Sequence, residues 1–388
     1  MRSTRILMTT DTVGGVWVYA LELAHALTSH SCEVALATMG SYLSPSQVRE
    51  TARIPHLTLY ESDYKLEWME DPWADVDEAG AWLLELGQEV QPDVVHLNNY
   101  THGALPWSFP VLMVGHSCVL SWWQAVKGER APAQWETYQR RVRQGLCSAD
   151  LIVTPTQTML RALERHYGPL PATQVIHNGR NAHRFTPGAK EPFILAIGRL
   201  WDEAKNIQLL DSIAPELPWP ILIAGQDEHP EGRQVRFQNV QSLGRLDGEA
   251  VCRWLARAGI YALPARYEPF GLSVLEAAMA GCALVLGDIP SLRELWEDAA
   301  CFVPPDDEAA LAEALQRVAA DGELRRQLAM AARSRSRRFS ANTMGAAYWL
   351  AYQTLRSDSV AVPSRPQPGR ERTFAYQSPV FRPQPARV

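Results

Sequence analysis

Short apolar runs alternate with longer segments of helical periodicity along most of the chain. Apolar runs this short predict buried strands, and the segments between them are long enough for crossover helices. The alternation is typical of parallel sheets with helices on both faces, so we expect an α/β fold. The runs span residues 5–9, 34–38, 93–97, 110–114 and 151–153 in the first half, and 192–197, 220–224, 240–243, 260–263 and 283–286 in the second.

Turn-forming residues separate the two halves of this pattern. Asn178-Gly179 and Pro187-Gly188 favour turns, so we place a linker near residues 180–191. A chain of 388 residues is too long for one ordinary core. We therefore expect one domain over residues 1–185 and a second over residues 186–340.

Two segments follow the second domain. Residues 341–356 predict a final amphipathic helix, whereas residues 357–388 combine repeated Pro with Arg and predict a disordered tail with an unknown partner. Before them, a long helical stretch from about Asp306 ends in the basic run 333–338. Cations at a helix end are the simpler interpretation of this run, and contact with an anionic membrane surface is the alternative.

Charge and composition restrict the partners. The net charge of −6 argues against general nucleic-acid binding, because no overall positive field attracts a phosphate backbone. No apolar run approaches the roughly 18 residues of a membrane-spanning helix. The six cysteines are scattered without metal-like pairing, so we expect reduced thiols and a cytoplasmic protein, with peripheral contact at the inner membrane face as the alternative.

Two carboxylates flank an apolar turn in the second half. Glu268 precedes Pro269-Phe270-Gly271-Leu272, and Glu276 follows it. A strand is predicted before this turn and a helix over residues 272–280, so the turn joins strand to helix. A helix start offers free N–H groups to a phosphate, and the two acids suit a sugar and a ribose. An ordinary solvated loop is the simpler alternative.

Each half has a further candidate loop, which directly follows the first strand of that half. Gly198-Arg199 precede Lys205-Asn206, and an arginine with a lysine suits a diphosphate. Gly14-Gly15 permit close backbone approach to a ligand, although their spacing is not that of a dinucleotide fingerprint. Taken singly, solvated cations are the simpler interpretation of the Arg199 and Lys205 loop, and an ordinary strand-to-helix turn explains the Gly14-Gly15 loop equally well.

In this order the motifs resemble the retaining, nucleotide-sugar-dependent glycosyltransferases of family 4. The resemblance spans residues 4–355 and implies the GT-B architecture, in which two Rossmann-like domains with parallel sheets face each other across an interdomain cleft. It also implies that residues 341–356 cross back to the first domain. The motifs are Gly14-Gly15, His116, Val175–Gly179, Gly198–Leu200 with Lys205-Asn206, and Glu268–Leu272 with Leu275–Ala277.

The resemblance implies roles for individual residues. Arg199 and Lys205 hold the donor diphosphate, Glu276 binds the ribose hydroxyls, and Glu268 and His116 line the sugar. The implied catalytic group is His116, Glu268, Arg199 and Lys205, and the implied donor-binding group is Gly14, Gly15, Arg199, Lys205, Glu268, Phe270, Gly271, Leu272 and Glu276. Trp122 and Trp123 follow His116 and are candidate acceptor contacts, with a packing role as the alternative.

The implied reaction moves a sugar from a UDP- or GDP-sugar to a hydroxyl of a glycan, lipid or small molecule, with retention of configuration. No cofactor and no metal are expected. Asp75 and Asp77 resemble a metal motif but lie in a Trp-rich acidic segment that predicts a loop and a helix. The alternatives are a nucleotide-sugar epimerase or hydrolase and a non-catalytic nucleotide-sugar-binding scaffold. The basic pair argues against a scaffold, because a binder has no departing charge to stabilise.

Overall fold

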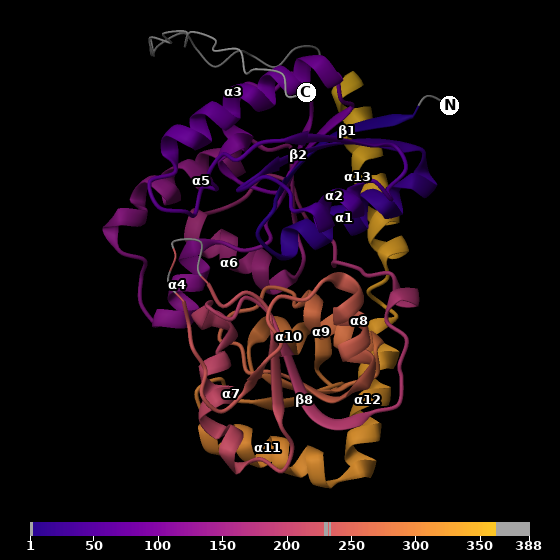
Figure 1. Cartoon of the computed structure of the whole chain (residues 1–388). Helices are drawn as coiled ribbons and strands as arrows, with labels where there is room; N and C mark the ends of the chain where they lie inside the picture. Colours follow the sequence, from indigo (N-terminus) through magenta and orange to yellow (C-terminus); the bar gives the residue numbers. More distant parts are fainter. Residues whose placement is uncertain (1–2, 229–231, 233, 362–388) are drawn as a thin grey trace, which may run out of the picture.

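Two parallel β-sheets with flanking helices build the molecule (Figure 1). The computed structural model describes residues 3–228, 232 and 234–361, with side chains to residue 357. The first sheet has seven strands in the order β3-β2-β1-β4-β5-β6-β7. Their bounds are β1 Thr4–Asp11, β2 Cys32–Met39, β3 Leu57–Glu61, β4 Val94–Leu97, β5 Val111–Val114, β6 Leu151–Thr154 and β7 Thr173–Val175.

The second sheet repeats the arrangement with six strands in the order β10-β9-β8-β11-β12-β13. In both sheets the strand that comes first along the chain lies inside the sheet. The next two strands lie on one side of it, and the later strands lie on the other side. This is the strand order of doubly wound Rossmann folds, which place ligands at the carboxyl ends of the strands. The bounds are β8 Glu191–Ile197, β9 Ile221–Ala224, β10 Gln241–Ser242, β11 Ala258–Leu263, β12 Ala283–Gly287 and β13 Cys301–Val303.

Helices cover both faces of each sheet, which explains why the strands are apolar throughout. In β8, Phe193 and Leu195 enter one core cluster, whereas Ile194 and Ala196 enter another. The helices are α1 Gly15–Leu27, α2 Pro45–Thr51, α3 Trp73–Val90, α4 Val119–Lys127, α5 Glu136–Ser148, α6 Gln157–Tyr167, α7 Ile207–Ile213, α8 Gly248–Arg257, α9 Leu272–Met279, α10 Pro290–Trp296, α11 Glu308–Ala320, α12 Gly322–Ser336 and α13 Ala341–Ala361.

The last helix, α13, leaves the second half of the molecule and packs against the first (Figure 1). Met344, Tyr348 and Tyr352 share a core cluster with residues of α1. The helix runs to Ala361, so residues 357–361 of the predicted tail are helical. The first Pro after the helix is Pro363, and the residues before it do not break a helix. The remainder of the predicted tail, residues 362–388, lies outside the described residues.

The expectation of one continuous helical stretch from Asp306 to Arg338 is wrong. It divides at Asp321, whose side chain accepts hydrogen bonds from the backbone N–H groups of Glu323 and Leu324, each at 2.9 Å. Asp321 thereby starts α12 as its N-cap, a role for which aspartate is well suited. The α/β fold class is confirmed, and all ten predicted strands are present.

Candidate active site

The turn between β11 and α9 places the Glu268 carboxylate at the start of α9. Gly271 precedes the helix with φ of +83°, a conformation that side chains disfavour, which accounts for glycine here. The backbone N–H of Gly271 donates to Glu268 Oε1 at 3.0 Å. The glutamate therefore occupies one of the N–H groups that were expected to approach a phosphate.

Lys205 binds the same carboxylate. Its Nζ lies 2.5 Å from Glu268 Oε2, and the two side chains are 14% and 12% exposed. Lys205 ends a short 3-10 helix, Glu203–Lys205, which Asp202 caps through a hydrogen bond from the Ala204 N–H at 3.0 Å. Asn206 then anchors the loop by donating to the Pro264 carbonyl at 3.1 Å. A bound diphosphate would compete with Glu268 for Lys205, because both are anions.

Arg199 lies where the two halves of the molecule meet. Its Nη2 donates to Asp202 Oδ2 at 2.8 Å, and its side chain is 39% exposed. It also faces Asp11, at the end of β1. Burial raises the pKa of the Asp11 carboxyl, and the positive charge of Arg199 opposes that rise. Arg199 thus lies close to the first glycine loop and retains exposed surface for a ligand.

The Gly14-Gly15 loop faces the second domain. A Cβ added to Gly14 would lie 3.8 Å from Arg199 Nη1, and one added to Gly15 would lie 3.8 Å from Leu272 Cδ1. The φ of Gly14 is −159°, an extended conformation open to any residue. The backbone therefore does not require glycine at residue 14. The pair provides space where α1 and α9 begin opposite each other.

His116 follows β5 and joins a buried polar cluster. Its Nε2 lies 2.8 Å from Asn98 Oδ1, and its ring packs edge-on against Tyr19, with centroids 4.5 Å apart. Asn98 also lies 3.3 Å from His96 Nε2, and His96 Nδ1 lies 2.6 Å from the Tyr352 hydroxyl of α13. Burial lowers the pKa of His116 to about 3, and nearby His96 adds to this effect. The ring is therefore neutral near pH 7.

Glu276 is buried on α9, and its partner was not predicted. Its Oε1 lies 2.8 Å from Arg180 Nε, and Arg180 also pairs with Glu22 of α1. Phe270 is buried at 3% exposure, so only its backbone is placed for a ligand. Leu272 packs against the core cluster that contains α1.

The tryptophan pair occupies α4, next to the second domain. Trp122 Nε1 donates to Asp202 Oδ1 at 3.0 Å, so this tryptophan touches the carboxylate that also holds Arg199. Trp123 packs tilted against it, with ring centroids 5.8 Å apart. Both rings are partly exposed. The structure thus places Trp122 in contact with the candidate donor residues.

Asp75 and Asp77 are engaged by neighbouring groups. Asp75 Oδ1 accepts from the Lys65 N–H at 3.2 Å, and Asp77 Oδ1 lies 2.5 Å from Arg141. Within residues 3–228, 232 and 234–361, the structure contains no group of three or more His, Cys, Asp or Glu side chains arranged to hold a metal ion. Within the same residues, no helix is long and apolar enough to cross a membrane.

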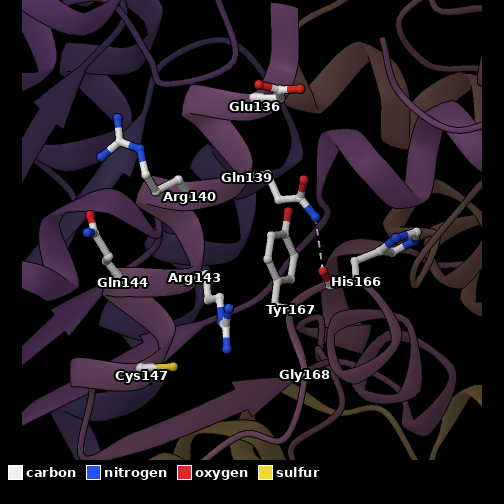
Figure 2. Close-up of a pocket in the computed structure, with 9 residues that line it drawn as sticks. All are labelled: Glu136, Gln139, Arg140, Arg143, Gln144, Cys147, His166, Tyr167 and Gly168. Carbon is white, nitrogen blue, oxygen red and sulfur yellow. Dashed lines mark hydrogen bonds between the residues drawn. The ribbon is translucent and has the colours of Figure 1, made fainter. Parts of the chain in front are cut away.

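One cavity lies apart from the candidate residues, and a second borders them at Asp202 and Asn206. One of about 700 Å³ lies between α5 and the end of α6, where Gln139 Nε2 donates to the His166 carbonyl at 3.4 Å (Figure 2). Another of about 460 Å³ is lined by residues of the loop after β8 and by α7. Neither is lined by Arg199, Lys205, Glu268 or Glu276. Lys205 and Glu268 instead contact each other, so an anionic ligand at Lys205 would compete with this contact.

Sequence reasoning missed three residues of this site. Asn98 follows β4, Asp202 caps the loop that carries Lys205, and Arg180 follows the crossover turn. The signal for Asn98 was its place at a strand end, where parallel sheets gather ligand contacts. Asp202 had the signature of a helix cap. No sequence pattern pointed to Arg180, since its partners lie on two distant helices.

Family profiles match both halves of the chain. The profile described as "Glycosyltransferase Family 4" matches residues 13–184, and the one described as "Glycosyl transferases group 1" matches residues 191–321. Together with two Rossmann-like sheets joined by α13, these matches define a glycosyltransferase of the GT-B class. The chain belongs to glycosyltransferase family 4.

Known relatives agree over most of the chain. Glycogen synthase of Mycobacterium tuberculosis is 28% identical over 371 residues, which cover 83% of this chain and 86% of the relative. D-inositol 3-phosphate glycosyltransferase of Xylanimonas cellulosilytica is 25% identical over an alignment of 396 positions, gaps included. The alignment covers 87% of this chain and 91% of that relative.

Solved structures share the fold at low identity. Sucrose-phosphate synthase from Thermosynechococcus elongatus has a TM-score of 0.78 at 21% identity, covering 92% of this chain and 100% of that one. Anabaena HepE in complex with UDP-glucose has a TM-score of 0.71 at 15% identity, covering 92% and 100%. At these identities the likeness establishes the fold and no more.

Proposed function

We propose that this glycosyltransferase moves a sugar from a UDP- or GDP-sugar to an acceptor hydroxyl, with retention of configuration and without a metal ion. The observation that carries the proposal is that Lys205 and the start of α9 both contact Glu268, while Arg199, held by Asp202, lies next to the Gly14-Gly15 loop with exposed surface. Two cations and a helix N-terminus provide the positive charge that a departing diphosphate needs. The UDP-glucose bound to HepE supports a donor of this kind.

The chemistry follows from where charge develops. The bond between the anomeric carbon and the diphosphate oxygen breaks, and its electron pair goes to the diphosphate. The acceptor oxygen bonds to the same face of that carbon, and its proton passes to the leaving diphosphate oxygen. Arg199, Lys205 and the N–H groups of α9 stabilise the diphosphate, which is electrostatic preorganisation. Glu268 orients sugar hydroxyls and faces the positive charge that develops on the sugar ring.

Two observations bear on the acceptor, one on where it binds and one on its chemical class. Trp122 contacts Asp202, so an acceptor stacked on this ring would lie next to the diphosphate site. The names of the relatives point to hydroxyls of different kinds, since one is a glycogen synthase and another a D-inositol 3-phosphate glycosyltransferase. A glycan or a polyol is therefore the acceptor class to test first.

The test is a panel of UDP-, GDP- and ADP-sugars, incubated in EDTA with glucan and inositol acceptors. We expect acceptor-stimulated nucleotide release from one donor, and NMR of the product should show the anomeric configuration of the donor. An inverted product would refute the retaining mechanism, and dependence on added Mg²⁺ or Mn²⁺ would refute metal independence. Release that is equally fast without acceptor would favour a nucleotide-sugar hydrolase, and binding without release would favour a scaffold.

A further inference from the structure

Three charged side chains meet between α1, the segment after β7, and α9. Glu22 lies on α1, Arg180 follows Asn178-Gly179, and Glu276 lies on α9. Arg180 Nη1 pairs with Glu22 Oε2, and Arg180 Nε lies 2.8 Å from Glu276 Oε1. The residues are 6%, 6% and 8% exposed, in chain order. One cation therefore faces two carboxylates in a region largely shielded from water.

The position of Arg180 is fixed from several sides. Its backbone N–H donates to the Phe339 carbonyl, and its own carbonyl accepts from the Ala341 N–H, both at 3.1 Å. Its guanidinium carbon lies 5.3 Å from the centroid of the Phe185 ring. Glu22 is held in turn, since its Oε1 accepts from the Asn181 N–H at 2.9 Å. The guanidinium is thus placed by its surroundings and not by Glu276 alone.

Arg180 favours the ionised form of Glu276. Burial raises the pKa of the Glu276 carboxyl, Arg180 opposes that rise, and the negative charge of Glu22 adds to it. Without Arg180, two buried carboxylates would repel each other, and Glu276 would tend to take up a proton. A protonated carboxyl accepts fewer hydrogen bonds than a carboxylate.

Glu276 retains free acceptor capacity. Arg180 Nε is close enough for an ion pair, but its N–H is not aligned for a hydrogen bond. Within the described part of the chain, no residue other than Arg180 donates a hydrogen bond to the Glu276 carboxylate. An ionised carboxylate with open lone pairs suits vicinal hydroxyls, which would act as donors.

We propose that Arg180 is a positioning residue of the donor site, which keeps Glu276 ionised and oriented toward the ribose hydroxyls while Glu22 holds Arg180. This inference rests on the proposed function, because it takes the bound ligand to be a nucleoside diphosphate. It also connects α1 to ribose binding, since Glu22 of α1 contacts Arg180, and Arg180 in turn contacts Glu276.

The experiment crosses protein variants with ligand variants. Calorimetry measures the affinities of UDP and GDP and of their 2′-deoxy and 3′-deoxy analogues for the wild type and for Arg180→Leu. We expect the wild type to lose about tenfold or more in affinity for one deoxy analogue, the loss typical of a hydrogen bond to a charged group. In Arg180→Leu the ratio of the affinities for the nucleotide and its deoxy analogue should fall close to one, because Glu276 no longer binds the hydroxyl. Arg180→Lys should restore part of it.

Control variants separate the outcomes. Arg335→Leu removes another partly buried arginine, which bonds to the Leu295 carbonyl at 2.5 Å, and should leave the deoxy ratio unchanged. Glu22→Gln should reduce the ratio less than Arg180→Leu and serves if the leucine variant does not fold. Equal deoxy ratios in the wild type and both Arg180 variants would overturn the inference alone. Failure of the wild type to bind UDP or GDP would overturn the proposed function and the inference with it.

Discussion

The amide oxygen of Asn98 accepts a hydrogen bond from Nε2 of His116 at 2.8 Å, which determines the ring nitrogen that carries the proton. The Asn98 amide is held in this orientation because its Nδ2 donates to the Thr9 carbonyl at 2.7 Å. An amide oxygen only accepts, so His116 Nε2 carries the hydrogen and Nδ1 of the neutral ring keeps its lone pair. Among the described residues no hydrogen bond uses that Nδ1, so it is open to a donor-sugar hydroxyl.

Asn98→Asp should introduce a titration into the activity. A carboxylate beside His116 favours the imidazolium and raises the pKa of His116 from about 3 toward the neutral range. The imidazolium has no Nδ1 lone pair, so kcat/KM should fall as pH is lowered from 8 to 6. The wild type should show no histidine titration in that range. In the double variant Asn98→Asp/His116→Gln the profile should be flat again, and a titration that persists there would contradict this role of His116.

Acid should destabilise the fold through its buried histidines. Burial lowers the pKa values of His96 and His102 to about 3 and about 4. Between these values and the ordinary value near 6.5, the unfolded chain binds more protons than the folded one, so stability falls as pH falls. Each histidine should contribute up to about 1.4 kcal/mol per pH unit in that window. Urea unfolding from pH 7 to pH 4.5 measures this slope, and His96→Gln should reduce it. An unchanged slope would show that His96 is not kept neutral.

Lys205→Ala should impair the chemical step. Lys205 is the nearest cation to Glu268, and its loss removes charge that the leaving diphosphate needs. We expect kcat to fall by about 100-fold or more, the cost usual for one such interaction. Steady-state kinetics with the donor identified by the panel measure it. Arg257→Ala, which breaks an exposed ion pair with Glu191, is the control and should retain wild-type rates. Equal rates in both variants would refute the diphosphate role.

Gly271→Ala and Gly128→Ala separate strain from function. Both glycines have positive φ, +83° and +71°, so alanine should cost each about 1 kcal/mol of stability. At Gly128 the added Cβ meets nothing within 4 Å, whereas at Gly271 it lies 3.3 Å from Glu268 Cγ. The Cβ added at Gly271 also lies 3.1 Å from Val274 Cγ2. Gly271→Ala should therefore lower the thermal stability somewhat more than Gly128→Ala, and it alone should lose activity. A comparable loss of activity in Gly128→Ala would mean that stability alone explains the effect.

The sheets were largely predictable because parallel strands covered on both faces are apolar throughout. The strands that the sequence analysis missed, β3, β7 and β13, are edge strands, and most of their side chains are partly or fully exposed. A half-exposed edge strand lacks the continuous apolar run that reveals a central one. The division at Asp321 was missed because helix propensity is high on both sides of a single capping residue.

The candidate site was predictable only where its residues share a local motif. Glu268, Gly271 and Glu276 belong to one strand-to-helix connection, so their proximity follows from the sequence. Arg180 and Asn98 act through partners far along the chain, at Glu22 and His116. Such contacts arise from the order in which strands and helices lie side by side, which no periodicity encodes. The ion pair between Lys205 and Glu268 was missed for the same reason.

The close approach of α13 to α1 should depend on Gly345. A Cβ added to Gly345 would lie 2.8 Å from the Ala26 Cβ, too close for the helices to keep their present spacing. Gly345→Ala should therefore cost about 1–3 kcal/mol, which outweighs the gain in helix propensity. Differential scanning calorimetry measures the shift in Tm. Leu350→Ala, on an exposed part of the same helix, is the control. Because Ala26→Gly removes the opposing methyl, the loss in Gly345→Ala/Ala26→Gly should be smaller than the sum of the single losses. Additive losses would show that the two residues do not limit this packing.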